Sequence, residues 1–543
     1  MRRRFSEFFL LTRIRRKFAR NLDWTSRSAK RRRHLHLSDL VPGPVTAHPD
    51  AGSIDTINVT GISSDSRAVA PGHLFVALKG SSGDGRAYAV AAVKAGAVAI
   101  LTDEREPDAS LARLAESGVP VLTCTAPRLE LAHAAARFWR RQPGMIAAVT
   151  GTNGKTSTVE FLRQIWSRVT WDAASIGTLG LQCNDPRKMQ GSMHGLPPLT
   201  TPDAVSLHSA LQPLTGAGVT HLAIEASSHG LAQHRLDGLN IHIAAFTNLS
   251  RDHLDHHEDM DSYFAAKSRL FTDLLLAGGS AVINIDDEYG AKLAASMRAA
   301  DPRQHVVITV GQDKSADFRI ADISPMDFGL EITVEHKEQA YRIPVALAGA
   351  FQAVNAVTAA VMAYASGLPI HDSLSALPYV TGAEGRMQLV TGHPGGARVI
   401  VDYAHTPDAL EAALRALRPE ARGRLAVLFG AGGDRDSGKR PMMGKVAHDH
   451  ADIAYVTDDN PRSEDAGAIR SQIIAACPNA IEIADRGTAI NTALDELEKG
   501  DVLLIAGKGH EAFQLVGDET LPFSDSSVAR NAIQRLTEGG EQT

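Results

Sequence analysis

The chain has 543 residues, of which 44% are hydrophobic, 22% are charged and 5% are aromatic. This length exceeds what a single hydrophobic core usually serves, so about three domains of ordinary size are expected. The formal net charge of −6 argues against a nucleic-acid-binding protein, and no apolar stretch is long enough to cross a bilayer.

Residues 1–36 differ in composition from the rest of the chain. The first 33 residues hold thirteen Lys and Arg but only two acidic residues, Glu7 and Asp23. The apolar run at residues 8–11 is too short for a signal-peptide core. A transit peptide, an anchor for anionic surfaces and a disordered tail added by an upstream start codon all fit this pattern. We favour the disordered tail and place the first folded domain after residue 36.

Residues 37–142 alternate short β-type runs with alanine-rich segments. Helices are expected at 87–95 and 129–140, and a strand is expected at 97–101. A glycine-rich turn at residues 80–85 separates two of these segments. The pattern predicts a small α/β domain.

From residue 143 to residue 382, apolar runs alternate with helical segments. The runs are residues 145–149, 220–224, 241–246, 281–285 and 305–310. Strands that alternate with helices predict a mostly parallel sheet that is covered on both faces. The section 318–346 is typical of antiparallel strands, and a helix is expected over 351–365.

The first of these runs leads into the motif Gly151-Thr-Asn-Gly-Lys-Thr156, which precedes a helix-like segment. A glycine-rich turn between a strand and a helix offers backbone N–H groups and the positive helix end to phosphate oxygens. The lysine adds a positive charge, and the threonine hydroxyl can reach Mg²⁺. The strict Walker spacing requires glycine at the position of Val149, so the formal pattern fails while its physical elements remain. An ordinary turn is the alternative; we predict ATP binding through Gly154, Lys155 and Thr156.

Three further groups in this region are candidates for the same site. Glu225 ends an apolar strand, where a carboxylate can bind a metal, although such a group more often caps a helix or is held by hydrogen bonds. The run 247–258 is rich in His and Asp, and its carboxylates favour a hard cation over structural zinc. His253 is our preferred ligand in this run, and a solvated polar loop is the alternative. Lys267 lies in an amphipathic segment, 261–271, where composition alone indicates a surface charge.

Residues 383–543 follow a glycine-dense linker, which we place near 382–396, and resume the alternation of strands and helices. Five runs predict a second doubly wound sheet, at 398–401, 425–429, 453–456, 481–484 and 502–505.

Three loops at the ends of these strands, residues 429–436, 457–462 and 507–511, are rich in recognition groups. Because Arg pairs bidentately with carboxylates, the loops fit a zwitterionic amino-acid ligand. The alternative is a set of ion pairs that only stabilise the loops. The Gly-x-Gly at 507–509 does not complete a dinucleotide fingerprint, so a nicotinamide cofactor is not expected.

Several motifs resemble those of the ATP-dependent Mur ligases, in order, between about residues 62 and 514. The first four are Thr150-Gly-Thr-Asn-Gly-Lys-Thr156, Glu225-Ala-Ser-Ser-His-Gly-Leu231, Phe246-Thr-Asn-Leu-Ser-Arg-Asp-His-Leu-Asp255 and Val401-Asp-Tyr-Ala-His-Thr-Pro-Asp408. Three more resemble family members that add meso-2,6-diaminopimelate, namely Gly432-Gly-Asp-Arg435, Asp459-Asn-Pro-Arg462 and Gly507-Lys-Gly-His-Glu511.

The resemblance implies three α/β domains. These are a small UDP-binding N-terminal domain (37–142), a central phosphate-loop ATPase domain with a mostly parallel sheet (143–382) and a C-terminal doubly wound, Rossmann-like domain (383–543). It also implies an ATP-dependent ligase of peptidoglycan precursor synthesis, with a role in cell shape and division. Such an enzyme joins meso-2,6-diaminopimelate to the D-glutamate of UDP-N-acetylmuramoyl-L-alanyl-D-glutamate through an acyl phosphate. Mg²⁺ is the implied cofactor, and ATP is a co-substrate.

The resemblance further implies roles for individual residues. The implied catalytic residues are Lys155, His253 and Lys267, the last carbamylated by CO₂. The implied metal ligands are Thr156, Glu225, His253 and the Lys267 carbamate. The implied ATP-binding residues are Gly151, Thr152, Asn153, Gly154, Lys155, Thr156, Ser157, Asn355, Arg386 and Asp402. The implied UDP-substrate residues are Ser64, Ser66, Ser81, Ser82, Gly83, Thr200, Thr201, Ser227, Gln233 and Arg235. The implied diaminopimelate-binding residues are Arg435, Asp459, Asn460, Pro461, Arg462, Gly507 and Glu511.

Two other functions remain open from the sequence. One is a sister ligase that adds lysine or a dipeptide, which the Asp459-Asn-Pro-Arg462 motif disfavours. The other is a non-catalytic, plastid-type homologue that serves as a scaffold, which the intact phosphate loop and amino-acid loops disfavour. Gln352 departs from the asparagine that is usual in relatives.

The expected partners are small molecules only: the UDP-N-acetylmuramoyl dipeptide, meso-diaminopimelate and ATP. We expect no nucleic acid, no stable membrane insertion and a monomer. The three cysteines, Cys124, Cys183 and Cys477, lie far apart with no Cys-x-x-Cys spacing, which fits a reducing compartment. The expected location is therefore the cytoplasm.

Overall fold

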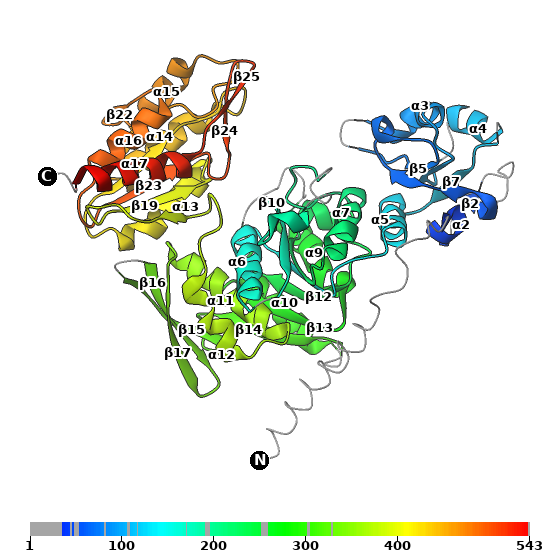
Figure 1. The fold of residues 1–543 in the computed structure, drawn as a ribbon, viewed down its shortest axis with the longest axis horizontal. Coiled ribbons are helices and arrows are strands. Elements are labelled where there is room, and N and C mark those ends of the chain that lie inside the picture. The colour runs from blue at the N-terminus through cyan, green and yellow to red at the C-terminus, as the bar shows by residue number, and fades with distance from the viewer. Residues whose placement is uncertain are drawn as a thin grey trace.

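The structure, a computed structural model, describes residues 35–43, 46–47, 54–80, 83–105, 109–116, 118–169, 171–189, 196–250, 259–300, 304–326 and 329–540. Figure 1 shows three domains, with the N-terminal and C-terminal domains on opposite sides of the central one. Most of the predicted basic extension, residues 1–34, lies outside the described residues. Its last two residues instead form β1 (Leu35–His36), which pairs antiparallel with β3 (Asn58–Val59). Residues 35 and 36, which the prediction places in the extension, therefore pair with a strand of the first domain.

The N-terminal domain is an α/β domain, as the alternating pattern predicts. Its main sheet has the strand order β2-β7-β6-β5-β4, and the β2–β7 pair alone is antiparallel among these strands. Leu74 and Val76 of β5 enter one hydrophobic core and Phe75 enters the other, because successive strand residues point to opposite faces. The elements are α2 (Leu37–Leu40), β2 (Thr46–Ala47), β4 (Gly61–Ser63), β5 (His73–Val76), α3 (Ala89–Lys94), β6 (Ala99–Asp103), α4 (Ala109–Glu116), β7 (Val121–Cys124) and α5 (Pro127–Phe138).

The central domain is built on a ten-stranded sheet in the order β10-β9-β11-β8-β12-β13-β14-β15-β16-β17. Its first half comprises β8 (Met145–Thr150), α6 (Lys155–Arg168), β9 (Ala173–Gly177), β10 (Gly180–Cys183), α7 (Ala204–Gly216), β11 (His221–Glu225), α8 (Ser228–Ala232), β12 (Ile241–Phe246) and α9 (Met260–Arg269). A π-helical turn (Leu270–Leu274) follows, and then β13 (Leu275–Asn284), α10 (Glu288–Ala299), β14 (Val306–Gly311), β15 (Phe318–Met326), β16 (Gly329–His336), β17 (Gln339–Val345), α11 (Ala350–Ala365) and α12 (Ile370–Ser375). The strands β15, β16 and β17 are antiparallel to one another, as predicted.

The strand β8 lies inside this sheet, between β11 and β12, and all of its residues are buried. Met145, Ala147 and Val149 contribute to the core that holds α6 and α11, whereas Ile146 and Ala148 contribute to the core that holds α7. Burial on both faces explains why residues 145–149 of this strand are all apolar. Since β9, β11, β8 and β12 run parallel, the loops that follow them meet at one edge of the sheet.

The C-terminal domain has a six-stranded sheet in the order β18-β19-β23-β20-β21-β22. All five predicted strands are present, although β22 is shorter than the predicted run. The predicted linker at 382–396 is only partly a linker, because β18 pairs antiparallel with β19 at the edge of the sheet. The elements are β18 (Gln388–Val390), β19 (Arg398–Asp402), α13 (Pro407–Leu417), β20 (Leu425–Phe429), α14 (Lys439–His450), β21 (Ile453–Val456), α15 (Ala466–Ile474), β22 (Ile481–Glu482), α16 (Arg486–Asp495), β23 (Val502–Ala506), β24 (Phe513–Val516), β25 (Glu519–Pro522) and α17 (Asp525–Gly540).

A buried carboxylate joins the central and C-terminal domains. Glu420 accepts a hydrogen bond from the Gly349 N–H at 2.6 Å and pairs with Arg398 at 2.7 Å. Ala348, which precedes Gly349, packs in the core of the C-terminal domain. A fixed polar contact therefore links the two domains at a point away from the chain connection between them.

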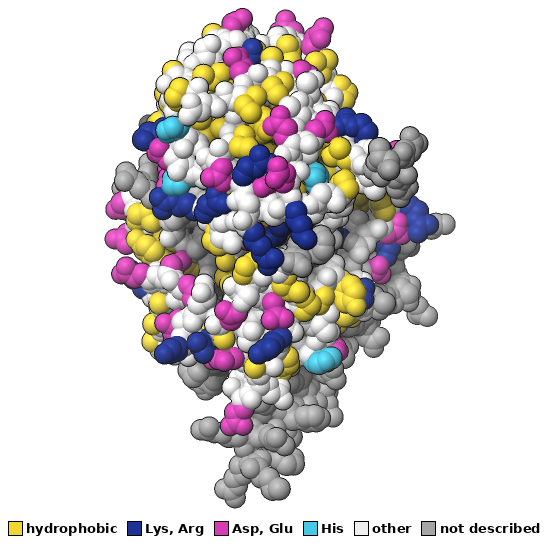
Figure 2. Space-filling view, turned by 90° about the vertical axis from the view of Figure 1, so that its left-hand side faces the viewer, with side chains coloured by type: hydrophobic (Ala, Val, Ile, Leu, Met, Phe, Trp, Pro, Cys, Tyr) yellow, Lys and Arg dark blue, Asp and Glu magenta, His cyan; other side chains and the backbone are white. Residues whose placement is uncertain are grey.

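Among the residues that the structure describes, no helix is both long and apolar enough to cross a bilayer. Acidic and basic side chains are interspersed on the face shown in Figure 2.

A fully buried ion pair between α16 and α17 provides a test of the C-terminal fold. Arg486 donates from Nε and Nη2 to the two carboxylate oxygens of Asp525, at 2.7 and 2.8 Å. Asp525→Asn leaves the guanidinium without its counter-charge, so we expect the free energy of unfolding to fall by about 3–5 kcal/mol. Urea unfolding followed by circular dichroism measures this change. Asp495→Asn is the matched control, because Asp495 pairs with Arg535 at a half-exposed site and should cost less than about 1 kcal/mol. Equal losses for the two variants would contradict the prediction.

Candidate active site

The phosphate loop connects β8 to α6 at the carboxyl edge of the sheet. Gly151 and Gly154 adopt positive φ angles of 148° and 83°. A Cβ atom at Gly151 would lie 1.9 Å from Thr247 Oγ1, and one at Gly154 would lie 2.4 Å from Asn355 Oδ1. Both positions therefore need glycine, for conformation and for space. Thr247 Oγ1 also donates to the Asn153 carbonyl at 2.6 Å, which fixes the loop to the chain that follows β12.

Lys155 is the first residue of α6, and its side chain folds back over the loop. Its Nζ donates to the carbonyl oxygens of Gly151 at 2.9 Å and Thr152 at 2.8 Å. No side chain caps the start of the helix at Gly154. The first-turn N–H groups of a helix lack intrahelical partners and carry partial positive charge, which suits an anion. The structure thus has the strand, loop and helix arrangement that the motif predicts.

Glu225 ends β11 next to this loop, and only 1% of its surface is exposed. Its carboxylate accepts hydrogen bonds from the N–H and the hydroxyl of Thr178, at 2.7 and 3.2 Å. Burial raises the pKa of Glu225, while the charge of Lys155 and a hydrogen bond from Thr156 act in the opposite direction. Glu225 is therefore hydrogen-bonded, as the alternative interpretation allows, but it does not cap a helix, because Ser227 caps α8. A buried carboxylate beside a hydroxyl is a donor set that fits a hard cation such as Mg²⁺.

Lys267 lies on α9 and is only 1% exposed, so the interpretation as a surface charge is wrong. Its Nζ donates to the Gly151 carbonyl at 2.8 Å and lies 4.5 Å from the centre of the Tyr263 ring. The Tyr263 hydroxyl in turn lies 3.2 Å from Thr152 Oγ1. Two lysines from different helices, Lys155 and Lys267, therefore reach the same carbonyl of the phosphate loop.

Some predicted residues lie outside the described part of the chain. These are His253, within the run 251–258, and the pair Ser81 and Ser82. Within the described ranges, no group of three or more His, Cys, Asp or Glu is placed to hold a metal ion. The role of His253 stays a prediction.

The predicted nucleotide contacts come from three places in the chain. Asn355 lies on α11, Arg386 lies just before β18, and Asp402 ends β19. Asn355 Nδ2 donates to Gln352 Oε1 at 3.1 Å, and Gln352 Nε2 donates to the Arg386 carbonyl at 3.0 Å. Burial raises the pKa values of Asp402 and Glu225, and the charge of Arg386 partly offsets both shifts. The charge of Arg386 therefore favours the ionised form of one carboxylate in each domain, Glu225 in the central domain and Asp402 in the C-terminal domain.

The predicted UDP-substrate residues fall into two sets. The first surrounds the end of β11, where Thr201 Oγ1 donates to the Glu225 carbonyl at 2.8 Å and Arg235 Nη1 donates to the Thr201 carbonyl at 2.7 Å. This set comprises Thr200, Thr201, Ser227, Gln233 and Arg235. The second set, Ser64, Ser66 and Gly83, lies in the N-terminal domain. A ligand held by both sets would span two domains.

The predicted amino-acid residues gather where β21 and β23 end. Asn460 Nδ2 donates to Glu511 Oε2 at 3.0 Å, and a Cβ atom at Gly507 would lie 3.3 Å from Asp459 Oδ2. Arg462 Nη1 donates to the Gly433 carbonyl at 2.7 Å, and its backbone has a φ of 52°. A non-glycine residue in this left-handed region is strained by about 1–2 kcal/mol, and such strain clusters at functional sites. Pro461 is buried beside Asn460, whereas Arg435 is exposed on the loop after β20.

Lys508 belongs to the same cluster, but the predicted set omits it. Its side chain is fully buried, and Nζ lies 2.9 Å from Asn460 Oδ1, 3.4 Å from Asp459 Oδ1 and 3.6 Å from Glu511 Oε2. A buried ammonium must be paired, so this lysine orients the surrounding carboxylates. The sequence signal that could have identified Lys508 is its position between two glycines at the end of a strand.

The hairpin formed by β24 and β25, which the sequence did not predict, supports this cluster from the other side. Its Leu515 N–H donates to Asn460 Oδ1 at 2.9 Å, and Gln514 Nε2 donates to the Asp459 carbonyl at 2.7 Å. The Arg462 N–H donates to the Leu515 carbonyl at 3.1 Å. The hairpin thus fixes the backbone and side chains of residues 459–462.

Family models match the chain in three consecutive segments. "Mur ligase family, catalytic domain" matches residues 58–139, "Mur ligase middle domain" matches residues 149–363, and "Mur ligase, glutamate ligase domain" matches residues 385–509. These segments fall within the three domains of the structure.

Individual proteins are similar over nearly the whole chain. Two curated relatives are named UDP-N-acetylmuramoyl-L-alanyl-D-glutamate–2,6-diaminopimelate ligase. The one from Bradyrhizobium diazoefficiens is 47% identical over 499 residues, covering 92% of this chain and 99% of that protein. The one from Agrobacterium fabrum is 47% identical over 483 residues, covering 89% of this chain and 95% of that protein. A solved structure of a ligase with the same name has a TM-score of 0.69 and 32% identity, covering 93% of this chain and all of that one.

Proposed function

The chain belongs to the Mur ligase family, whose members are ATP-dependent ligases, and from this we propose that it joins meso-2,6-diaminopimelate to the D-glutamate of UDP-N-acetylmuramoyl-L-alanyl-D-glutamate. The observation that carries the proposal is that the chain has both kinds of loop. The central domain has a phosphate loop at residues 151–156, and the C-terminal domain has a strained loop with charged side chains at residues 459–462. The reaction serves peptidoglycan precursor synthesis. Nucleotide-linked substrates and three free cysteines support a cytoplasmic enzyme, which we propose acts as a monomer.

The chemistry needs activation of a carboxylate, because a carboxylate is a poor electrophile. Its oxygen attacks the γ-phosphorus of ATP, which forms an acyl phosphate and releases ADP. The neutral amine of diaminopimelate then attacks the acyl carbon, and the tetrahedral intermediate expels phosphate while the nitrogen loses a proton. Lys155 and the first-turn N–H groups of α6 would neutralise charge on the phosphates, and the three domains would position the reactants.

Mg²⁺ would supply further neutralisation of the phosphate charge. Thr156 and Glu225 are suited to hold it, since Thr156 offers a hydroxyl in the first turn of α6 and Glu225 offers a buried carboxylate at the end of β11. We propose that Lys267 carries a carbamate, which would turn a buried cation beside the loop into an oxygen ligand. Its position against the Gly151 carbonyl supports this role. His253 is the proposed partner ligand.

The ATP loop and the amino-acid loops belong to different domains, so we propose that the domains close around the substrates. Arg386 lies between them and acts on Glu225 and Asp402. Small-angle scattering should show compaction when a nucleotide and the UDP-substrate are added together. An unchanged radius of gyration would count against closure.

A product assay tests the proposed function directly. The purified chain is incubated with Mg·ATP and the UDP-N-acetylmuramoyl dipeptide, with diaminopimelate or lysine in parallel. We expect a tripeptide product with diaminopimelate and ATP hydrolysis that depends on both other substrates. Equal kcat/KM values for the two amino acids would reject the substrate assignment, and no product with either would reject the ligase.

Arg462 is predicted to decide the choice of amino acid. Its guanidinium could bind the second carboxylate of diaminopimelate, a group that lysine lacks. We expect Arg462→Ala to raise the KM for diaminopimelate by about 10- to 100-fold, because a charge-assisted hydrogen bond is lost. The KM for ATP should change less than about twofold. Steady-state kinetics with each substrate varied in turn measures both values. Arg415→Ala, an exposed residue of α13, serves as the control, and a parallel rise in both KM values would contradict the prediction.

A further inference from the structure

Two loops of the C-terminal domain pack against each other beside Arg462. One loop follows β20 and comprises residues 432–435, and the other follows β21 and comprises residues 459–464. A Cβ atom at Gly433 would lie 1.9 Å from the Pro461 carbonyl oxygen, so the two backbones meet where only glycine fits. A shift of one loop must therefore move the other.

The position of the Arg462 guanidinium depends on the loop after β20. Its Nη1 donates to the Gly433 carbonyl at 2.7 Å, and a Cβ atom at Gly432 would lie 2.9 Å from the same nitrogen. A carbonyl leaves the positive charge in place, so a ligand carboxylate can still pair with it. Each loop also has a non-glycine residue in the left-handed region, Asp434 with a φ of 53° and Arg462 with a φ of 52°. Such strain persists only where the surrounding contacts enforce it.

An ion pair between Arg440 and Glu464 supplies contacts of this kind. Arg440 is fully buried in the first turn of α14, and its Nη2 donates to the Glu464 carboxylate at 2.9 Å and to the Gly432 carbonyl at 3.2 Å. Glu464 also accepts a hydrogen bond from the Asp434 N–H at 2.6 Å. The hydrogen bonds from Arg440 and from that N–H lower the pKa of Glu464, so the pair is charged at neutral pH. The residues on both sides of the carbonyl that Arg462 contacts are thus held by this ion pair.

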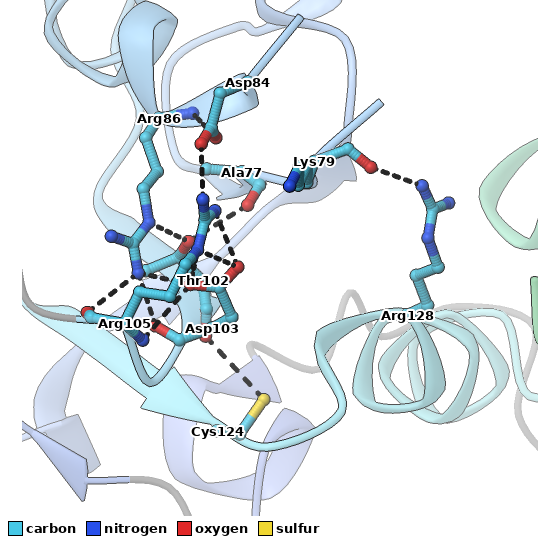
Figure 3. Close-up of polar contacts among 9 residues, drawn as sticks. All are labelled: Ala77, Lys79, Asp84, Arg86, Thr102, Asp103, Arg105, Cys124 and Arg128. Carbon is cyan, nitrogen blue, oxygen red and sulfur yellow. Dashed lines mark hydrogen bonds and ion pairs between the residues drawn. The ribbon is translucent and has the colours of Figure 1, made fainter. Parts of the chain in front are cut away.

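Arg86 makes a comparable set of contacts in the N-terminal domain (Figure 3). It is buried, pairs with the Asp103 carboxylate, and donates from Nη2 to the Asp103 and Arg105 carbonyls at 2.7 and 3.0 Å. An arginine can fix a loop in this way because its guanidinium carries several donors in a rigid plane. That N-terminal loop contains none of the predicted substrate-binding residues. The loop that Arg440 holds contains one of them, Arg435, and contacts another.

We propose that Arg440 and Glu464 are positioning residues that determine the choice of amino acid, because they hold the Gly433 carbonyl and, through it, the guanidinium of Arg462. The inference rests on the proposed function, in which Arg462 binds the second carboxylate of diaminopimelate. Without the ion pair, the loop after β20 loses a contact on each side of Gly433, and Arg462 loses the acceptor that orients it. A bidentate pair of Arg with a carboxylate depends on alignment, so a displaced guanidinium discriminates less.

Steady-state kinetics of Glu464→Ala tests this inference, with diaminopimelate, lysine and ATP varied in turn. Lysine differs from diaminopimelate only by lacking the second carboxylate. We expect the KM for diaminopimelate to rise by about 10-fold, because a charge-assisted contact is weakened. The kcat with diaminopimelate, the KM for ATP and the kcat/KM for lysine should each change by less than about twofold, since the lost interaction is a binding contact with the second carboxylate alone.

Two conservative variants refine the test. Glu464→Gln keeps an oxygen that can accept from the Asp434 N–H, so it should recover part of the affinity for diaminopimelate. Arg440→Lys keeps the charge but not the planar group that reaches both acceptors, so it should raise the same KM.

The chain offers two matched controls. Glu411→Ala removes another half-buried carboxylate from the same domain, one that pairs with Arg415 on α13. Asp103→Ala removes the acidic partner of Arg86, a buried arginine far from the amino-acid loops in the sequence. Both variants should keep the wild-type KM for diaminopimelate.

Several outcomes would overturn the inference. One is a wild-type KM for diaminopimelate in a folded Glu464→Ala protein. Another is an equal loss of kcat/KM with diaminopimelate and lysine, or a parallel rise in the KM for ATP, because either result indicates a general structural role. A wild-type protein that does not prefer diaminopimelate over lysine would overturn the proposed function as well. If the wild type has this preference and the Glu464→Ala protein keeps it unchanged, the inference alone fails.

Discussion

Replacing Lys155 by alanine is expected to lower kcat by about 10³-fold or more while the protein stays folded. The negative charge on the transferred phosphoryl group must be neutralised during its transfer, and a positioned cation at such a site contributes on this scale. In the structure, Lys155 Nζ lies on the Gly151 and Thr152 carbonyls and needs only a side-chain rotation to reach phosphate oxygens above the loop. Initial rates of ADP release in the complete assay measure the effect.

Lys314→Ala is the control for this experiment, because Lys314 is an exposed lysine of the same domain. Circular dichroism and thermal unfolding should be unchanged in both variants. If Lys155→Ala keeps more than about a tenth of the wild-type kcat, the phosphate loop does not work as we describe.

Replacing Lys267 by alanine is expected to lower kcat by about 10²-fold or more. A metal ion at a phosphoryl group contributes several kcal/mol of charge stabilisation, and the proposed carbamate would be one of its ligands. Removing dissolved CO₂ should slow the wild-type enzyme, and bicarbonate should restore it. The alanine variant should respond to neither treatment.

Two further variants separate the carbamate from a simple positive charge. Lys267→Arg keeps the cation but cannot form a carbamate, so it should be as inactive as Lys267→Ala. Lys292→Ala removes an exposed lysine from α10 and should behave as the wild type. An active Lys267→Arg protein would argue against the carbamate.

The local parts of the fold follow closely from the sequence. The strand β12 spans 241–246 as predicted, because a mostly apolar run between helices is typical of a strand covered on both faces. The phosphate loop was also predictable, since its glycines, lysine and threonine are consecutive and the strand and helix beside it have strong periodicity. Short elements such as β18 and the β24–β25 hairpin were missed, since runs of three or four residues carry too little pattern.

Contacts between distant parts of the chain account for the other differences. Lys267 lies 116 positions from Gly151, and no periodicity in its helix indicates that its ammonium reaches that carbonyl. Lys508 is a similar case, because two of its three partners, Asp459 and Asn460, belong to a distant segment of the chain. In each case the side chain's role depends on which neighbours folding brings to it.

The buried contact of Glu420 with Gly349 and Arg398 limits how the two larger domains can move. A rotation of the C-terminal domain that keeps this contact must have its axis near Glu420. The largest displacements would therefore occur far from residue 420. Separating the pair would leave a charge without its partner in an apolar setting. Heat should therefore release the two domains together as one cooperative unit.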